Sequence, residues 1–471
     1  MPALWIALLV VFGASGGIGA QQRPPHDSAI ESLIADANSA PPEFAADALI
    51  RISSLPKVDH AWRRELLEDA YMRAYGAPEQ YRRSTTTQFP VDSRIGAQVF
   101  AYATALTRVT LQVRAVQLMA LVDPDRAREL FEWIDLNLAP GSCADPLVPA
   151  VGEYYSTLGQ LAGTTYPRSR SDALTFLQLY AWRAHLPSEM PALARAIQRF
   201  RSGPLEAAYF EGFFRQILQG SSADAPGFSS AALDIISRMT EWQIADTALG
   251  VPGSGVMDAL RGYLVAQLKA PRCADNAIAA TVPSAFNAAV RRTKAEFDVK
   301  LMDPDPAKTG TLGIARVDPY WQSPEGARLH DAAVRLHGPG AVPVPMRTRL
   351  TDAWRNQAER LLIDVEQWTG TKEPVERDYF YQKGALYLGL LDLMPASTVR
   401  SRALRSFADF MRHTETDVNR RMLWFAFVNR MLEMTRGPFR EEVLTAMEDT
   451  HQPVLWLYAK LERATPARRP D

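Results

Sequence analysis

Apolar residues recur every three to four positions through most of this chain, in segments long enough to form helices. In the segment from Trp62 to Ala74 the apolar side chains share one face, and charged side chains fill the other. A second segment, from Thr351 to Trp368, repeats the pattern. A period of about 3.6 residues of this kind predicts amphipathic helices that bury one face.

Proline and N-cap residues mark where these helices begin and end. Most of the 33 prolines fall between the periodic segments, because proline inside a helix costs about 3 kcal/mol. Asp123 followed by Pro124 is a helix start signal, and Ser28 with Glu31 predicts a capping box. The segment from Met422 to Leu432 is apolar nearly all round, which is typical of a core helix. We expect about fifteen helices and no convincing strand, and therefore an all-α fold.

One long break divides the helical pattern and sets the expected domain organisation. Residues 303–345 are rich in proline and glycine, and one short helix, about Pro324 to His337, interrupts them. This segment is expected to connect an N-terminal helical array over 21–302 with a C-terminal array over 346–464. A disordered tail is expected over 465–471.

Consecutive helical hairpins are typical of an α-solenoid of the HEAT or tetratricopeptide kind. The sequence has no fixed repeat period, so the expected fold is an irregular, solenoid-like stack of hairpins. The alternative is a closed (α/α) toroid, in which the last helices pack against the first.

The first twenty residues have the pattern of a secretory signal peptide. An apolar stretch from Leu4 to Phe12 is followed by small residues that end in Ile18-Gly19-Ala20. No Lys or Arg precedes the apolar stretch, which departs from the usual pattern. We expect an exported protein, periplasmic or extracellular, with a mature chain that begins at Gln21. No later apolar run approaches the length of about 18 residues that a transmembrane helix needs.

The two cysteines stand in similar surroundings. Cys143 lies in Ala-Pro-Gly-Ser-Cys-Ala-Asp and Cys273 in Ala-Pro-Arg-Cys-Ala-Asp, each in a short loop between helices. An even cysteine count in an exported chain favours a disulfide between them, and two free thiols are the alternative. A zinc site is not expected, because neither cysteine has a second ligand nearby in sequence.

The motifs of common catalytic chemistry are missing from the sequence. There is no HExxH metal motif, no GxSxG nucleophile elbow, no phosphate-binding glycine loop and no GxGxxG dinucleotide fingerprint. We therefore expect no cofactor and no metal. A net charge of −1 also argues against nonspecific nucleic-acid binding, which needs a basic surplus.

Carboxylates beside aromatic residues are the remaining catalytic option. Asp318 and Glu325 flank Tyr320 and Trp321, as in the carboxylate- and aromatic-lined cleft of an (α/α)-barrel glycoside hydrolase or polysaccharide lyase. A Trp in a proline-rich loop is more often a plug packed on the helices beneath it. Such an enzyme is therefore the alternative function.

Exposed aromatic residues could instead bind a partner. Tyr379 and Tyr381 are two positions apart on one predicted helix, so they cannot both face the same side. With Tyr320 and Trp321 they are the candidate binding residues. The preferred function is an exported binding or scaffold protein of the cell envelope, whose partner is a protein, a peptide or another envelope component.

Overall fold

The structure is a computed structural model. It describes residues 27–77, 83–84, 93–138, 147–200, 203–220, 228–250, 255–269, 272–273, 277–294, 299–303, 311–312, 321, 323–337, 351–370, 376–414 and 418–465. The expected signal peptide over residues 1–20 lies outside this set, as does the tail after residue 465.

The described residues form twenty α-helices, so the chain is all-α. In the first half these are α1 (Ser28–Asn38), α2 (Pro42–Ser53), α3 (His60–Arg73), α4 (Arg94–Tyr102), α5 (Arg108–Met119), α6 (Pro124–Glu132), α7 (Gly152–Thr165), α8 (Arg170–Ala181), α9 (Met190–Gln198) and α10 (Pro204–Gly220). The remainder are α11 (Phe228–Ala248), α12 (Gly255–Lys269), α13 (Ala277–Thr293), α14 (Pro324–His337), α15 (Asp352–Gln367), α16 (Glu376–Leu393), α17 (Thr398–Thr414), α18 (Val418–Met434), α19 (Arg440–Asp449) and α20 (Pro453–Ala464).

Short elements accompany the helices. They are the 3₁₀ helices η1 (Ala74–Gly76) and η2 (Pro187–Glu189), and the two-residue strands β1 (Arg83–Ser84), β2 (Val148–Pro149), β3 (Arg272–Cys273) and β4 (Thr311–Leu312). β1 pairs antiparallel with β2, and β3 pairs parallel with β4. The sequence pattern did not predict these strands, because two residues are too few to show an alternation.

The helix count exceeds the expected fifteen because some turns contain neither proline nor glycine. The connection between α4 and α5 passes through Ala105, which has a φ of 58°. A left-handed conformation is uncommon for a residue with a Cβ. The turn therefore has no marker in the sequence, and proline spacing alone misses it.

Most predicted helix starts are confirmed by their cap hydrogen bonds. The side chain of Asp59 accepts from the amide of Trp62 at 2.9 Å, and that of Asp123 accepts from the amide of Arg126 at 3.0 Å. Thr351 caps α15 in the same way. Each bond satisfies one of the amides that the first helical turn leaves unpaired.

The predicted cap of α1 is wrong by one residue. Ser28 is the first residue of the helix, and the cap is Asp27, whose Oδ1 accepts from the amide of Ala29 at 3.0 Å. Asp27 also forms an ion pair with Lys57 at 2.6 Å. A carboxylate near the helix N-terminus interacts favourably with the helix dipole, which a serine hydroxyl does less well.

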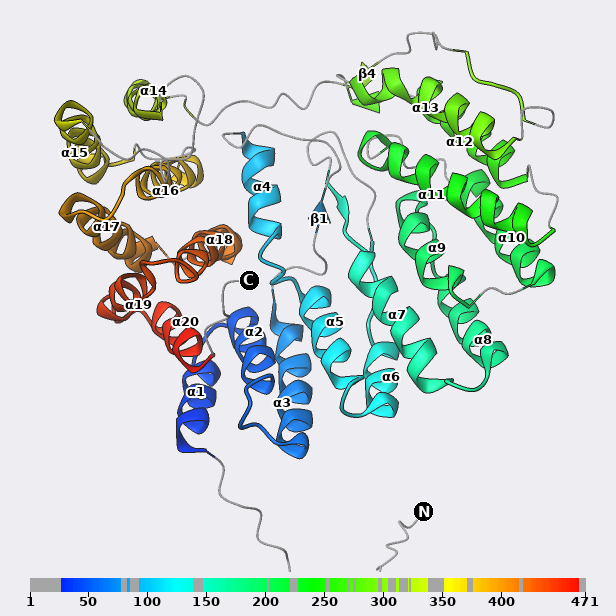
Figure 1. Ribbon diagram of the computed structural model, residues 1–471, viewed down its shortest axis with the longest axis horizontal. Helices are drawn as coiled ribbons and strands as arrows, with labels where there is room; N and C mark the ends of the chain where they lie inside the picture. The colour runs from blue at the N-terminus through cyan, green and yellow to red at the C-terminus, as the bar shows by residue number, and fades with distance from the viewer. Residues whose placement is uncertain are drawn as a thin grey trace, which may run out of the picture.

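The helices pack as two rows along a curved arch (Figure 1). Successive members of the inner row are in contact: α14, α16, α18, α20, α2, α5, α7, α9, α11 and α13. The outer row covers them on the convex side: α15, α17, α19, α1, α3, α6, α8, α10 and α12. Each helix therefore packs mainly on the next one or two along the arch. Helix lengths range from 9 to 21 residues, so the units are not of one size.

The order of helices along the arch is not their order in the sequence. The last helix, α20, packs against α1 and α2, and this joins the C-terminal helices to the N-terminal ones in the middle of the arch. The ends of the arch are α13 and α14. Helix α4 packs against α18 and lies on the concave side (Figure 1).

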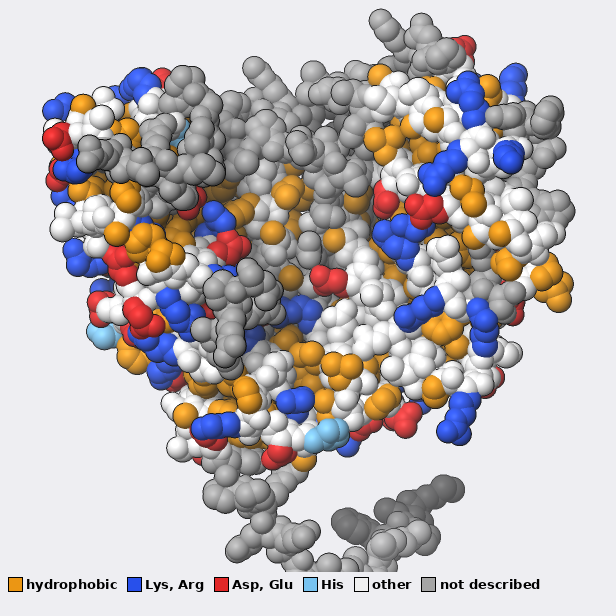
Figure 2. Space-filling view, in the orientation of Figure 1, with side chains coloured by type: hydrophobic (Ala, Val, Ile, Leu, Met, Phe, Trp, Pro, Cys, Tyr) orange, Lys and Arg blue, Asp and Glu red, His pale blue; other side chains and the backbone are white. Residues whose placement is uncertain are grey.

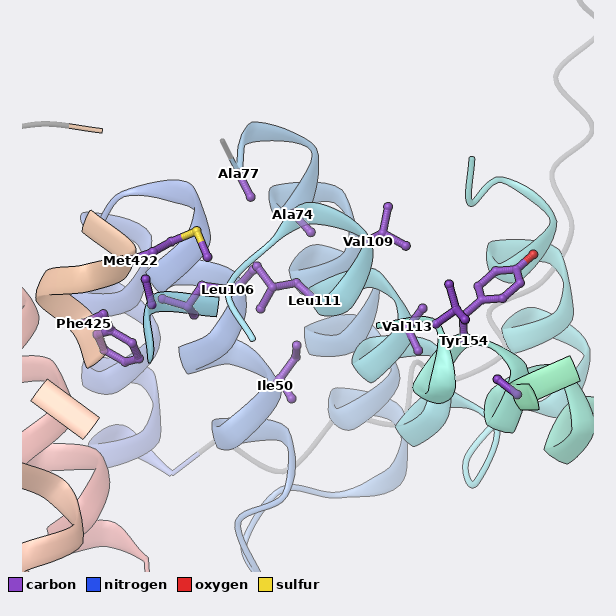
Figure 3. Packing of buried hydrophobic residues seen from close by; sticks show 14 of the residues in the cluster. Ile50, Ala74, Ala77, Leu106, Val109, Leu111, Val113, Tyr154, Met422 and Phe425 are labelled. Carbon is purple, nitrogen blue, oxygen red and sulfur yellow. The ribbon is translucent and has the colours of Figure 1, made fainter. Parts of the chain in front are cut away.

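Buried apolar side chains form a continuous layer through this junction. Figure 3 shows Met422 and Phe425 of α18 beside Ile50 of α2, with Leu111 of α5 and Tyr154 of α7 farther along. All five belong to one buried cluster, and each of the five is at most 6% exposed. The two halves of the chain therefore share one hydrophobic core.

A buried carboxylate holds the same junction together. Asp47 of α2 is 1% exposed, and its Oδ2 accepts from Tyr458 Oη at 2.6 Å and from Arg51 Nε at 2.9 Å. Its Oδ1 lies 2.7 Å from Arg114 Nη2 of α5. Burial alone would raise the pKa of Asp47, but the two guanidinium groups and the Tyr458 hydroxyl outweigh it and lower the pKa to about 2.

Candidate interaction face

Several of the predicted site residues lie outside the described residues. These are Cys143, Asp318 and Tyr320. For Cys273 only the backbone is described, as part of β3 opposite Leu312. The Cys143–Cys273 disulfide therefore stays a prediction.

The other residues of the predicted carboxylate cluster lie at the start of α14. Glu325 is exposed in the first turn of this helix. Trp321 is half-buried and packs against the hydrophobic core. Its ring centroid lies 4.5 Å from that of His330. Trp321 thus packs on α14, which is the arrangement of a loop plug.

The two candidate tyrosines face different sides of α16. Tyr379 is half-buried and donates from its hydroxyl to the carbonyl oxygen of Trp368 at 2.9 Å. Tyr381 is only 3% exposed, and its ring packs against Phe100 of α4 and Phe427 of α18. The side chain of Tyr381 is therefore not available at the surface of this structure.

Lys383 holds the side chain of Tyr379 in place through hydrogen bonds. Its Nζ donates to the carbonyl oxygen of Trp368 at 2.7 Å and to the hydroxyl of Tyr379 at 3.2 Å. Burial lowers the pKa of Lys383, and the charge of Glu366 partly opposes this shift. The ammonium group interacts with carbonyl groups at the C-terminal end of α15, so the cluster has a structural role as a helix cap.

A small pocket lies at the junction of the first and last helices. It has a volume of about 260 Å³ and is lined by Asp36, Ser39, His451, Pro453 and Trp456. Its carboxylate, Asp36, is already paired with Lys460 of α20 at 2.7 Å.

A larger exposed feature lies on the outer row, on α8 and α10. We call it the outer apolar face and define it by Leu179, Trp182, Leu205 and Tyr209. Their exposed fractions are 61%, 60%, 86% and 37%. The ring of Trp182 meets that of Phe213 edge-on at 6.0 Å, which links the end of α8 to α10. Hydrophobic side chains also stand at the right-hand edge of the molecule in Figure 2, over α10.

The exposed surface of α10 is almost free of charge. Arg215 is the one charged residue among the exposed positions of this helix. The others are Pro204, Leu205, Ala208, Tyr209, Gln216, Gln219 and Gly220. Other outer helices are different: α17 exposes Arg402, Arg405, Asp409 and Arg412, and α19 exposes Glu441 and Asp449. A solvent-facing helix surface normally carries charged residues, so the composition of α10 is unusual.

Ionisable side chains around the outer apolar face are engaged in local contacts. Glu206 accepts from the amide of Gly203 at 2.8 Å and so caps α10. Arg183 lies over the ring of Tyr180 at 4.9 Å. The four residues that define the face are uncharged, and Arg183 is exposed next to Trp182 at its border.

The described part of the chain has no cluster of three or more His, Cys, Asp or Glu side chains that could hold a metal ion. Among the described helices, none combines the length and the hydropathy needed to cross a bilayer. No family model, curated protein or solved structure matches this chain.

Proposed function

We propose that the protein is a binding scaffold of the cell envelope, built as a solenoid-like arch of helical pairs, which recognises a protein partner through the outer apolar face. The observation that carries the proposal is the exposure of Leu205, Trp182 and Leu179 on neighbouring helices. Contiguous apolar side chains on a protein surface usually mark a site of protein–protein contact.

The residue types support a protein partner. Trp and Tyr are enriched among the residues that contribute most to binding energy, and Trp182 and Tyr209 supply both. Because α10 exposes few charged side chains, a partner can cover it at a low desolvation cost. The packed rows beneath the face provide a rigid platform, as in other stacked-helix binding proteins.

The packing of α4 supports a binding site on the convex side. Stacked helices usually bind ligands in their concavity, but α4 already packs against α18 on that side. Export to the envelope rests on the N-terminal residue pattern, and proteolytic removal of the first twenty residues during secretion is its direct test.

Site-directed photo-crosslinking in cells that naturally produce the protein tests the proposal. A photoreactive amino acid replaces Ala208, an exposed residue in the middle of the α10 surface. The matched control places it at Ala266, which is exposed on α12. We expect discrete adducts from position 208 and none from position 266.

A second substitution shows whether the face itself is recognised. Leu205→Glu places a charge in the face, and we expect the adduct yield to fall at least about tenfold. Leu121→Glu is the matched control, because Leu121 is 73% exposed but lies in the turn after α5. Equal yields from both variants would contradict the proposal.

A further inference from the structure

We propose that the partner of the outer apolar face is a second copy of the same chain, paired across a two-fold axis at Gly212. This inference rests on the proposed function, whose binding surface it shares. In the pair, the two copies of α10 run antiparallel and in contact. The chain would then be a dimer in which the convex sides of two arches meet.

The sequence of α10 is suited to such a pairing. Gly212 is the midpoint of the helix Pro204–Gly220. Antiparallel pairing about this point sets Leu205 opposite Gln219 of the second copy, and Ala208 opposite Gln216. These positions are three or four residues apart along α10, so a helix with 3.6 residues per turn places them on one face. Apolar side chains from one copy therefore meet the aliphatic and amide groups of the other.

Gly212 and Ala208 allow the two helices to approach closely. A Cβ added at Gly212 would have no neighbouring atom within 4 Å, so the space above it is open. Small residues at the crossing point of two helices let the backbones come near each other. Larger side chains on either side, such as Leu205 and Tyr209, then fill the gaps beside the crossing.

The single charge on this surface also finds a partner in the pair. Arg215 is exposed near one end of the uncharged surface. The same antiparallel register places it opposite Tyr209 of the second copy. In the single chain the Arg215 side chain lies beside Gly255 at the start of α12, and it would turn towards the second copy to place its guanidinium group over this ring. Within α10 this register sets no like charges opposite each other, which is a condition for a self-complementary surface.

The area available is sufficient for a dimer. The exposed fractions of the four residues of the outer apolar face add up to the surface of about two and a half fully exposed side chains. At about 150–250 Å² for a large apolar side chain, this is on the order of 500 Å² per copy. Two copies would remove on the order of 1,000 Å², and the glutamine and small residues of α10 add to this. The total lies close to the lower end of the range of about 1,200–2,000 Å² that specific interfaces bury.

Sedimentation equilibrium of the purified mature protein tests the proposal. We expect twice the mass of a single chain at micromolar concentrations. Leu205→Glu is expected to raise the dimer dissociation constant on the order of a hundredfold, because two charges become buried at the contact. Leu121→Glu is expected to leave the constant unchanged.

Cysteine crosslinking tests the register. Residues on the two-fold axis approach within disulfide distance, about 4.4–6.8 Å between Cα atoms. A Gly212→Cys variant is therefore expected to form a covalent dimer under mild oxidation, seen on a non-reducing gel. Gly262→Cys on α12, an exposed glycine that also has open space above it, is the matched control and is expected to stay a single chain.

The outcomes separate this inference from the proposed function. A wild-type chain that stays monomeric up to about 100 µM overturns the dimer, as does a dimer that Leu205→Glu leaves intact. Adducts from position 208 to a different protein would then still support the binding scaffold. Absence of both dimer and adducts overturns both.

Discussion

Replacing Asp47 by asparagine is the most direct test of how the two halves of the chain are held together. The substitution keeps the size of the side chain and removes its charge. The amide group of asparagine would then point hydrogen-bond donors at Arg114, or at Arg51 and Tyr458, all of which are themselves donors. Both guanidinium groups would lose their common counter-ion.

The cost can be derived from the contacts. Removing one partner of a buried ion pair destabilises a protein by about 3–5 kcal/mol. The side chains of Arg51 and Arg114 are 33% and 25% exposed, so water can partly compensate. We expect the lower end of that range, a loss of about 3 kcal/mol in the free energy of unfolding at pH 7.

The pH dependence gives an independent check with a defined sign. The pKa of Asp47 is lowered from its ordinary value of 3.8 to about 2 in the folded chain. This corresponds to about 2 kcal/mol of stabilisation, because each pKa unit is worth about 1.4 kcal/mol. The contribution is complete above about pH 4 and is lost as the pH falls towards 2. The difference between wild type and variant is therefore expected to shrink over that interval.

Urea unfolding followed by circular dichroism, at pH 7 and at pH 2.5, measures both effects. Asp36→Asn is the matched control: Asp36 also joins the first helices to α20, through Lys460, but both side chains are about a third exposed. Such a pair contributes less than about 1 kcal/mol. If Asp47→Asn costs no more than Asp36→Asn, or if its cost is the same at both pH values, the junction does not depend on the buried charge.

Three further substitutions test packing elsewhere by the same unfolding measurement. Tyr155→Phe removes the hydroxyl that donates to buried Glu189 at 2.7 Å, and we expect a loss of about 1–2 kcal/mol; no loss would mean that another group replaces it. Gly384→Ala brings a Cβ to 2.5 Å from the ring of Phe427, and overpacking between α16 and α18 is expected to cost about 1–3 kcal/mol. Gly262→Ala, in α12, has open space and is expected to stabilise the chain by about 0.5–1 kcal/mol, so a shift in the same direction for both glycine variants would contradict these contacts.

Local features of the fold could be predicted from the sequence. The start of the helix after Asp123 and the short helix Pro324–His337 were predicted correctly, because the signals for each lie within a few residues of each other. Such signals depend on neighbours in the chain, and the sequence contains them completely.

Contacts between distant segments could not be predicted in this way. Tyr381 is buried because its ring packs against Phe100 of α4 and Phe427 of α18. Helix α4 lies nearly 300 residues earlier in the chain. The hydrogen bond between Tyr458 and Asp47 spans 411 residues. Nothing in the local pattern around either residue indicates its partner.

The outer apolar face illustrates the same limit for function. Leu205 and Tyr209 have the spacing of a buried stripe, and α10 also buries Phe210 and Phe214 on another side. A helix that is apolar on both sides is expected from its pattern to be a core helix. Its place on the outer row is known only from the packing of the other helices, so the sequence suggested different candidate residues.

Because α20 packs against α1 and α2, the first helices to leave the ribosome are among the last to be completed. Phe44 of α2 is fully buried, and its ring packs against Trp424 and Phe425 of α18, which are made nearly 400 residues later. Until then the growing chain presents an unfinished apolar surface. The centre of the arch can therefore be completed only when synthesis of the last helices has ended.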